Sequence, residues 1–218
     1  AHEVQIVSAA EAVLYKATSK PSEELTFRHF ALREVDDIVY LVVRRANRGE
    51  NTKSTPGSAA ADVYTVNVAL EEKVDSVEVE PNDEFSKATP LAPNGFREGF
   101  LAPHGDVDYF RIDSDAKMLL KLELTGVEHI DFVLSVIHVE GDSKETVLLK
   151  ANEGAAREPE QLNSVFCQGT CYVKVDSVAR KVDGRSIKED QNSQVSYRLS
   201  ALAIVDDVSE EREPNLTS

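Results

Sequence analysis

The chain has 218 residues, with 24 basic and 39 acidic side chains and a formal net charge of −15. That length corresponds to one large domain or about two small ones. The strong negative charge and the scattered lysines and arginines argue against nucleic-acid binding. The sequence has no run of 18 apolar residues, so it predicts no membrane span.

The sequence contains an internal repeat with a period close to 133 residues. The segment Glu78-Val-Glu-Pro-Asn82 recurs as Glu211-Arg-Glu-Pro-Asn215, an offset of 133. A period this long indicates tandem whole domains, because solenoid repeats run to roughly 20–50 residues. Three further pairs of segments match in the same order at offsets of 132 to 134: Tyr64–Val66 with Tyr197–Leu199, Tyr40–Val43 with Tyr172–Val175, and Val13–Ala17 with Val147–Ala151.

The repeat predicts three parts that differ in completeness. Residues 76–208 would form one complete domain, and residues 1–75 match only the back part of it. Residues 209–218 would be a linker and the start of a further copy. The chain would then be a piece of a longer array. The alternative is that residues 1–75 form a divergent small domain whose strands match the later ones only by a common β-pattern.

Within these parts the apolar pattern is that of β-strands. Leu120–Leu124, Cys171–Val175 and Tyr197–Ala201 alternate apolar and polar residues, as does Tyr64–Val68 in the partial unit. A period of two buries one face of a strand and exposes the other. Phe132–Ile137 is almost entirely apolar and predicts a central strand. The sequence therefore predicts an all-β fold, an antiparallel β-sandwich of the jelly-roll kind.

One segment carries a mixed signal. Residues 22–35 place acids before apolar residues at helical spacing, which alone would favour a helix. The matching segment, residues 154–163, contains Pro159, and a proline inside a helix costs about 3 kcal/mol. The repeat therefore favours a loop followed by a strand.

Two short motifs resemble those of the bacterial pre-peptidase C-terminal (PPC) domain family. They are Glu78-Val-Glu-Pro-Asn-Asp83 and Gly105-Asp-Val-Asp-Tyr-Phe110, with Ala88 and Gly99 between them. The family consists of β-sandwich modules appended to secreted proteases and other exported proteins, often in tandem. The resemblance covers about residues 76–208 and is best over the first 35. It implies an accessory role without catalysis.

The acidic residues of these motifs suggest a calcium site. Calcium takes six to eight oxygen ligands, drawn from carboxylates, amides and backbone carbonyls. In the related collagen-binding modules of clostridial collagenases, a calcium pair lies between such a linker and a nearby acidic loop. By that resemblance the candidate ligands are six residues: Glu78, Glu80, Asn82, Asp83, Asp106 and Asp108. The alternative is that these side chains cap turns and bind backbone amides, with no metal.

The two cysteines, Cys167 and Cys171, are separated by three residues and flanked by strand-like sequence. We interpret this spacing as a tight hairpin whose facing arms could be joined by a disulfide, which needs Cα atoms about 5.5–6 Å apart. A disulfide would place the protein outside the cytoplasm. A reduced pair is the alternative.

The sequence predicts no catalytic residues and no organic cofactor. The five histidines form no HExxH pair, and neither a nucleophile elbow nor a phosphate-binding glycine loop occurs. We therefore expect a non-catalytic module of a secreted or surface-displayed bacterial protein, with Ca²⁺ as the one candidate ion and a protein or extracellular polymer as partner. Its location would be extracellular, on the cell surface or periplasmic. The alternatives are a prodomain or ancillary domain of a secreted protease, and a spacer in an adhesin or stalk.

Overall fold

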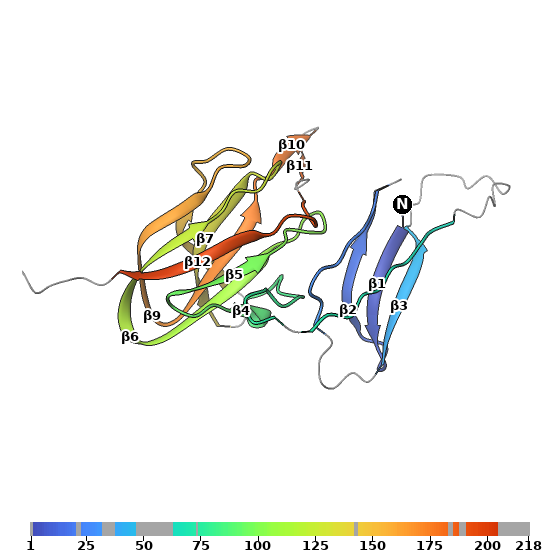
Figure 1. Ribbon diagram of the computed structural model, residues 1–218, viewed down its shortest axis with the longest axis horizontal. Coiled ribbons are helices and arrows are strands. Elements are labelled where there is room, and N and C mark those ends of the chain that lie inside the picture. Colours follow the sequence, from blue (N-terminus) through green and yellow to red (C-terminus); the bar gives the residue numbers. More distant parts are fainter. Residues whose placement is uncertain are drawn as a thin grey trace, which may run out of the picture. The chain divides into compact units, whose positions relative to one another are not determined.

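The computed structural model describes residues 2–20, 23–31, 38–46, 63–72, 74–141, 144–182, 185–187 and 191–204. Two compact units divide the chain, Ala1–Asp75 (unit 1) and Ser76–Ser218 (unit 2). Both are built from β-strands (Figure 1). Among the described residues, no helix is long and apolar enough to cross a membrane. The predicted start of a further copy, residues 209–218, lies outside the described residues.

Unit 1 contains one antiparallel sheet of three strands in the order β2-β1-β3. Their bounds are β1 His2–Ser8, β2 Val13–Thr18 and β3 Val39–Arg45. Tyr15 of β2 packs against the rings of Phe27 and Phe30, at centroid distances of 5.0 and 6.1 Å. Residues 23–31 contain no helix, as the repeat predicts. These aromatic rings therefore partly cover the sheet from a loop.

Unit 2 contains a larger sheet with the strand order β5-β12-β6-β9-β7-β8. All of these neighbours are antiparallel, and a short strand, β4, pairs in parallel with the start of β6. A separate pair, β10 and β11, is antiparallel too. The bounds are η1 Phe85–Lys87 (a 3-10 helix), β4 Thr89–Pro90, β5 Gly95–Gly99, β6 Asp108–Leu124, β7 Phe132–Glu140, β8 Lys144–Ala151, β9 Glu160–Ser177, β10 Arg180–Val182, β11 Arg185–Ile187 and β12 Tyr197–Ile204.

The two longest strands, β6 and β9, belong to both layers of unit 2. Residues 108–114 of β6 pair with residues 169–175 of β9, and residues 118–124 pair with residues 160–167. The register shifts between these stretches, and such bulges bend a strand pair. The first stretch of β6 joins β7 and β8 through β9, and the second joins β12 and β5.

A contact between rings shows that the sheet folds over on itself. Phe132 of β7 and Tyr197 of β12 have centroids 5.6 Å apart, although β6 and β9 separate their strands in the sheet. Neighbouring strands lie about 4.8 Å apart, so a flat sheet would hold these rings at roughly three times that distance. In Figure 1, β12 and β5 accordingly lie in front of β7 and β9. Unit 2 is therefore a β-sandwich, which confirms the predicted fold class.

The core of unit 2 lies between these layers. Twenty buried apolar residues form one cluster, among them Phe110, Leu122, Leu134 and Val173, each at most 1% exposed. The predicted central strand, Phe132–Ile137, is paired on both sides because β7 lies between β8 and β9. The predicted strands at Leu120–Leu124, Cys171–Val175 and Tyr197–Ala201 are parts of β6, β9 and β12.

The disulfide is present, but the predicted hairpin is wrong. Cys167 and Cys171 are bonded, and both lie within the single strand β9. Four residues of extended strand span about 13 Å, whereas these Cα atoms are 5.9 Å apart. The strand therefore bends sharply here, at Gly169, whose φ is +74°. The bond clamps β9 where it passes from one layer to the other, a path that residue spacing alone could not reveal.

The predicted strand at Tyr64–Val68 is also absent. Residues 63–72 form no strand, and Val63, Val68 and Leu70 are 92%, 77% and 84% exposed. The matching strand of unit 2, β12, pairs with β5 and β6. Unit 1 has no counterpart of β5 or β6 among its described residues. The alternating segment Tyr64–Val68 therefore has no described strand to pair with.

Candidate cation site

The first acidic motif lies in an extended linker along the edge of unit 2. Val77 forms a parallel bridge with Glu98 of β5, and the Glu78 N–H donates to the Glu98 carbonyl (2.9 Å). Farther along, the Tyr109 N–H at the start of β6 donates to the Asn82 carbonyl (3.1 Å). These backbone bonds hold the linker beside β5 and β6. Alternation then turns Glu78, Glu80 and Asn82 to the inside, as the sequence predicts, and all three are buried.

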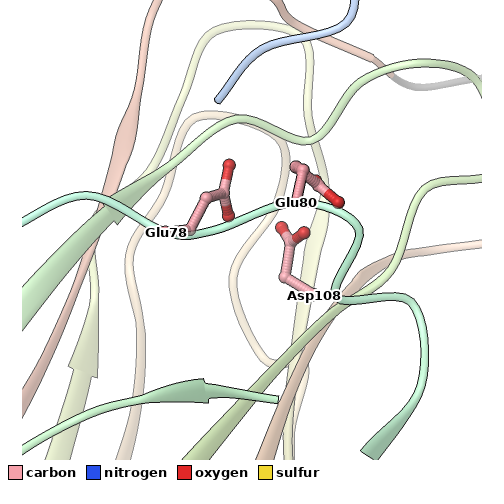
Figure 2. Close-up of side chains that lie close together, drawn as sticks. All are labelled: Glu78, Glu80 and Asp108. Atoms are coloured by element: carbon pink, nitrogen blue, oxygen red, sulfur yellow. The ribbon is translucent and has the colours of Figure 1, made fainter. Parts of the chain in front are cut away.

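Three carboxylates meet at this point. Oxygen atoms of Glu78, Glu80 and Asp108 all lie within 4.8 Å of one another, and the three residues are buried. Figure 2 shows that two of them come from the linker and the third from the beginning of β6, with the Asp108 carboxylate directed toward the linker. The fold thus brings together groups from both motifs, which are about 30 residues apart in sequence.

A buried phenol lies between two of these carboxylates. The Tyr197 hydroxyl is 2.6 Å from Asp108 Oδ2 and 3.2 Å from Glu78 Oε2. A hydroxyl has one proton to donate, so it can serve only one of these oxygens at a time. The Phe100 N–H donates to the other oxygen of Glu78 (2.7 Å). Tyr197 therefore orients Glu78 and Asp108, and as a neutral donor it removes neither negative charge.

Room for this arrangement comes from Gly99, at the end of β5. A Cβ at this position would collide with the Glu78 carboxylate and with the hydroxyl end of Tyr197. Gly99 is part of the sequence pattern that resembles the PPC family, and its lack of a side chain has a direct physical use here.

Three oxygen atoms of the two acidic motifs have no hydrogen-bond partner although they are fully buried. They are Glu80 Oε1, Asn82 Oδ1 and Asp108 Oδ1. The other Glu80 oxygen accepts the Asn82 N–H (2.9 Å). Buried polar atoms are nearly always satisfied in folded proteins, so three such oxygens in one place point to a missing ligand.

Asp106 and Asp83 have different roles. Both Asp106 oxygens accept backbone N–H groups, from Ala102 (2.7 Å) and Val107 (3.0 Å), so this side chain shapes the loop that contains Gly105. That behaviour fits the alternative of a turn-capping acid. Asp83 lies on the exposed side of the linker. The remaining four candidates are buried, and the oxygens of three of them, Glu78, Glu80 and Asp108, lie close together.

The environment raises the pKa of every carboxyl group in the cluster. Burial is the largest cause throughout, and it raises the pKa of Glu78, Asp106 and Asp108 well above the ordinary range. Burial and the nearby Asp83 raise the pKa of Glu80 to about 8. Partial burial raises the pKa of the Asp83 carboxyl, against the lowering effect of a side-chain hydrogen bond with Asp106, and burial beside Asp108 raises that of the Tyr197 phenol. The cause is the same in each case, since water is excluded from a group of like charges.

Four carboxylates are buried here: Glu78, Glu80, Asp106 and Asp108. Within the described part of the chain, no lysine or arginine forms an ion pair with any of them. A buried cluster of this kind must take up either protons or a cation. The ligands on offer are all oxygen, carboxylate and amide, with no thiolate or imidazole in the group. Oxygen-only sites suit hard cations such as calcium and magnesium. The cluster could therefore hold a metal ion.

Sequence reasoning missed the part that Tyr197 plays in the site. This residue lies 119 positions from Glu78 and was identified only as the start of an alternating strand. Its one signal is the repeat, which matches it with Tyr64. Thr89 was missed as well; its hydroxyl accepts the Val79 N–H (3.1 Å) and the Asn82 amide (3.5 Å), which fixes the orientation of the linker.

Comparison with known proteins gives likenesses to solved structures. No protein-family model matches the chain, and no curated protein matches it either. A solved structure, the pre-peptidase C-terminal domain of collagenase from Bacillus anthracis, aligns with 13% sequence identity over 60% of this chain and 99% of that chain. The TM-score is 0.35, so the fold assignment rests on the strand order and core described above and not on this likeness.

Proposed function

We propose that unit 2 is a non-catalytic accessory module of a secreted bacterial protein, stabilised by Ca²⁺ at the acidic cluster. One observation carries the proposal: Glu80 and Asp108 of the cluster, and Asn82 beside them in the linker, each have a buried oxygen without a hydrogen-bond partner. With Glu78 they offer three carboxylates and an amide. Calcium is preferred over magnesium. Magnesium demands near-octahedral geometry and keeps several bound waters, and a site of several buried protein oxygens excludes those waters.

The disulfide supports the location of this module. Disulfides persist in oxidising compartments, so the bond between Cys167 and Cys171 favours an extracellular, surface or periplasmic site. In such a place free calcium is plentiful, and an ion could serve as a structural element. The partner would be another protein or an extracellular polymer.

The test is thermal unfolding of the whole chain in chelator, in calcium and in magnesium. An ion that binds only the folded state stabilises it by about 2.7 kcal/mol at 100 times its Kd. For a unit of this size, the unit 2 midpoint should rise by on the order of 10 °C in calcium.

The matched variants are Asp108→Asn, which keeps the shape of a ligand but removes its charge, and Asp115→Asn, an exposed acid on the same strand. Asp108→Asn should abolish the calcium response and Asp115→Asn should keep it. An unchanged midpoint in millimolar calcium, or an equal response in both variants, would refute the proposed site.

A further inference from the structure

The three strands of unit 1 follow the same plan as one layer of unit 2. β1 is the middle strand of β2-β1-β3, as β7 is of β8-β7-β9. The bulges also correspond, since the register shifts between Ile6 and Val7 and between Val136 and Ile137. The residues paired in unit 1 match residues paired in unit 2: Val4, Ala17 and Val43 correspond to Leu134, Ala151 and Val175.

In unit 2 this layer is completed by strands from earlier in the sequence. β9 pairs along its second edge with β6, where Val173 faces Phe110 and both are at most 1% exposed. In unit 1, β3 pairs with β1, and no described strand of the unit pairs with its other edge. Leu41, the counterpart of Val173, is 42% exposed. Among the described residues, the outer edge of β3 and the inner face around Leu41 are thus open where those of unit 2 are closed, although Ile6 beside Leu41 is buried.

A second segment of unit 1 is open for the same reason. At the offset of 133, residues 63–70 match residues 196–203, nearly all of β12, and carry Val63, Val68 and Leu70, which are 77% to 92% exposed. β12 lies between β5 and β6 in unit 2. Both open features therefore require the same missing strands, those equivalent to β5 and β6.

We propose that the open edge of β3, the apolar face beside it and residues 63–70 form a docking surface for a polypeptide segment patterned like residues 76–130. The segment would come from the same polypeptide, ahead of residue 1, as residues 76–130 precede β7 in unit 2. It would add one strand to β3 and supply the paired strands that residues 63–70 lack among the described residues, where the ring of Tyr64 contacts that of His2. An exposed strand edge recruits extended peptide through its free N–H and C=O groups.

The chemistry of the surface defines its occupant. In unit 2, Phe110 and Ile112 of β6 pair with Val173 and Cys171 and lie inside the core. The corresponding positions of β3 are Leu41 and Val39, both apolar. An incoming strand must therefore carry large apolar residues at alternate positions and polar residues between them. Alternation of that kind buries one face and leaves the other in water.

A second copy of this chain fits the surface less well. Two β3 edges could pair, but that contact would supply no neighbour equivalent to β5. Residues 63–70 would stay exposed with their apolar side chains. A segment like residues 76–130 closes both features at once, so the structure favours it.

The experiment adds such a segment to the whole chain. A copy of residues 76–130 is fused directly before Ala1, because the β1 and β7 registers differ by 130 (Val4 and Leu134). Amide exchange of residues 39–43 and 63–70 is compared with and without the fusion. We expect protection of both segments to rise at least about 100-fold, as local opening gives way to a packed unit.

A matched control carries Phe110→Asp and Leu122→Asp in the added copy alone and should give no gain. Equal exchange with and without the fusion would overturn the proposal. It would also fail if the unfused chain formed dimers in which residues 39–43 were already protected. Neither result involves the cation site of unit 2, so the two proposals are tested separately.

Discussion

The β2-β1-β3 sheet of unit 1 and the β8-β7-β9 layer of unit 2 share strand order, direction and pairing, yet their side chains meet different surroundings. Val173 is 1% exposed, whereas its counterpart Leu41 is 42% exposed. The local pattern is thus enough to pair three strands, but burying their inner face needs strands from another part of the sequence. Pairing and burial are separate conditions, and unit 1 meets the second only in part, since Ile6 is buried while Leu41 is not.

The largest expected difference between the units is in the response to pH without metal. The pKa of Glu80 in the folded protein is about 8, against an ordinary value of 4.5. Between these values the folded state holds a proton that the unfolded state has lost, so the free energy of unfolding falls as pH rises. The slope is about 1.4 kcal/mol per pH unit for one such group.

Thermal unfolding of the chain in chelator at pH 5, 6, 7 and 8 measures this effect. The midpoint of unit 2, followed by amide exchange of Phe132–Ile137, should drop steadily, and saturating calcium should flatten the curve. A midpoint that rises with pH in chelator would contradict charge burial as the dominant property of the cluster.

The next largest difference concerns two matched residues of the middle strands. Leu134 is fully buried in unit 2, and Leu134→Ala should destabilise it by about 3 kcal/mol. Its counterpart is Val4, which is only partly buried, and Val4→Ala should cost less than about 1 kcal/mol. Denaturant unfolding with a probe in each unit gives both values. Equal losses would mean that the inner face of unit 1 is covered.

A smaller effect separates the two matched tyrosines. Tyr197→Phe removes the hydroxyl that donates to Asp108 and should cost about 2 kcal/mol. Tyr64 is 56% exposed, so Tyr64→Phe should leave stability within about 0.5 kcal/mol of the parent. The same unfolding measurement applies. A neutral Tyr197→Phe would show that the phenol does not hold the carboxylates in place.

The smallest effect comes from the disulfide, which only unit 2 contains. Replacing Cys167 and Cys171 by alanine should lower its stability by no more than about 2 kcal/mol, because the bond closes a very short loop. Intact mass before and after reduction and alkylation checks that the bond is present in the parent. Two thiols that alkylate without reductant would show that it does not form.

Residues with a local signal were predicted well. The alternating strands of unit 2 appear as β6, β9 and β12, and the linker alternation places Glu78 and Glu80 on one side because neighbouring residues in a strand point in opposite directions. Distant partners had no such signal. Tyr197 reaches Glu78 through the folding of the sheet, and no spacing rule relates residues so far apart.

The failures have the same origin. Tyr64–Val68 has the sequence of a strand, but a strand needs a neighbouring strand to pair with. Among the described residues of unit 1, no strand pairs with this segment. The two cysteines were close enough to bond, yet spacing fixes only a distance and not the path between the atoms. A bent strand and a hairpin give the same Cα separation. In both cases the deciding information lies in another segment of the chain.

The shared strands of unit 2 limit how this module can be rearranged. β6 and β9 run through both layers, so neither layer is an independent cassette. A protein engineer who wished to exchange one layer for that of a homologue would have to cut both strands at the bend closed by Cys167 and Cys171. Grafts that replace whole loops, by contrast, would leave these two strands unbroken.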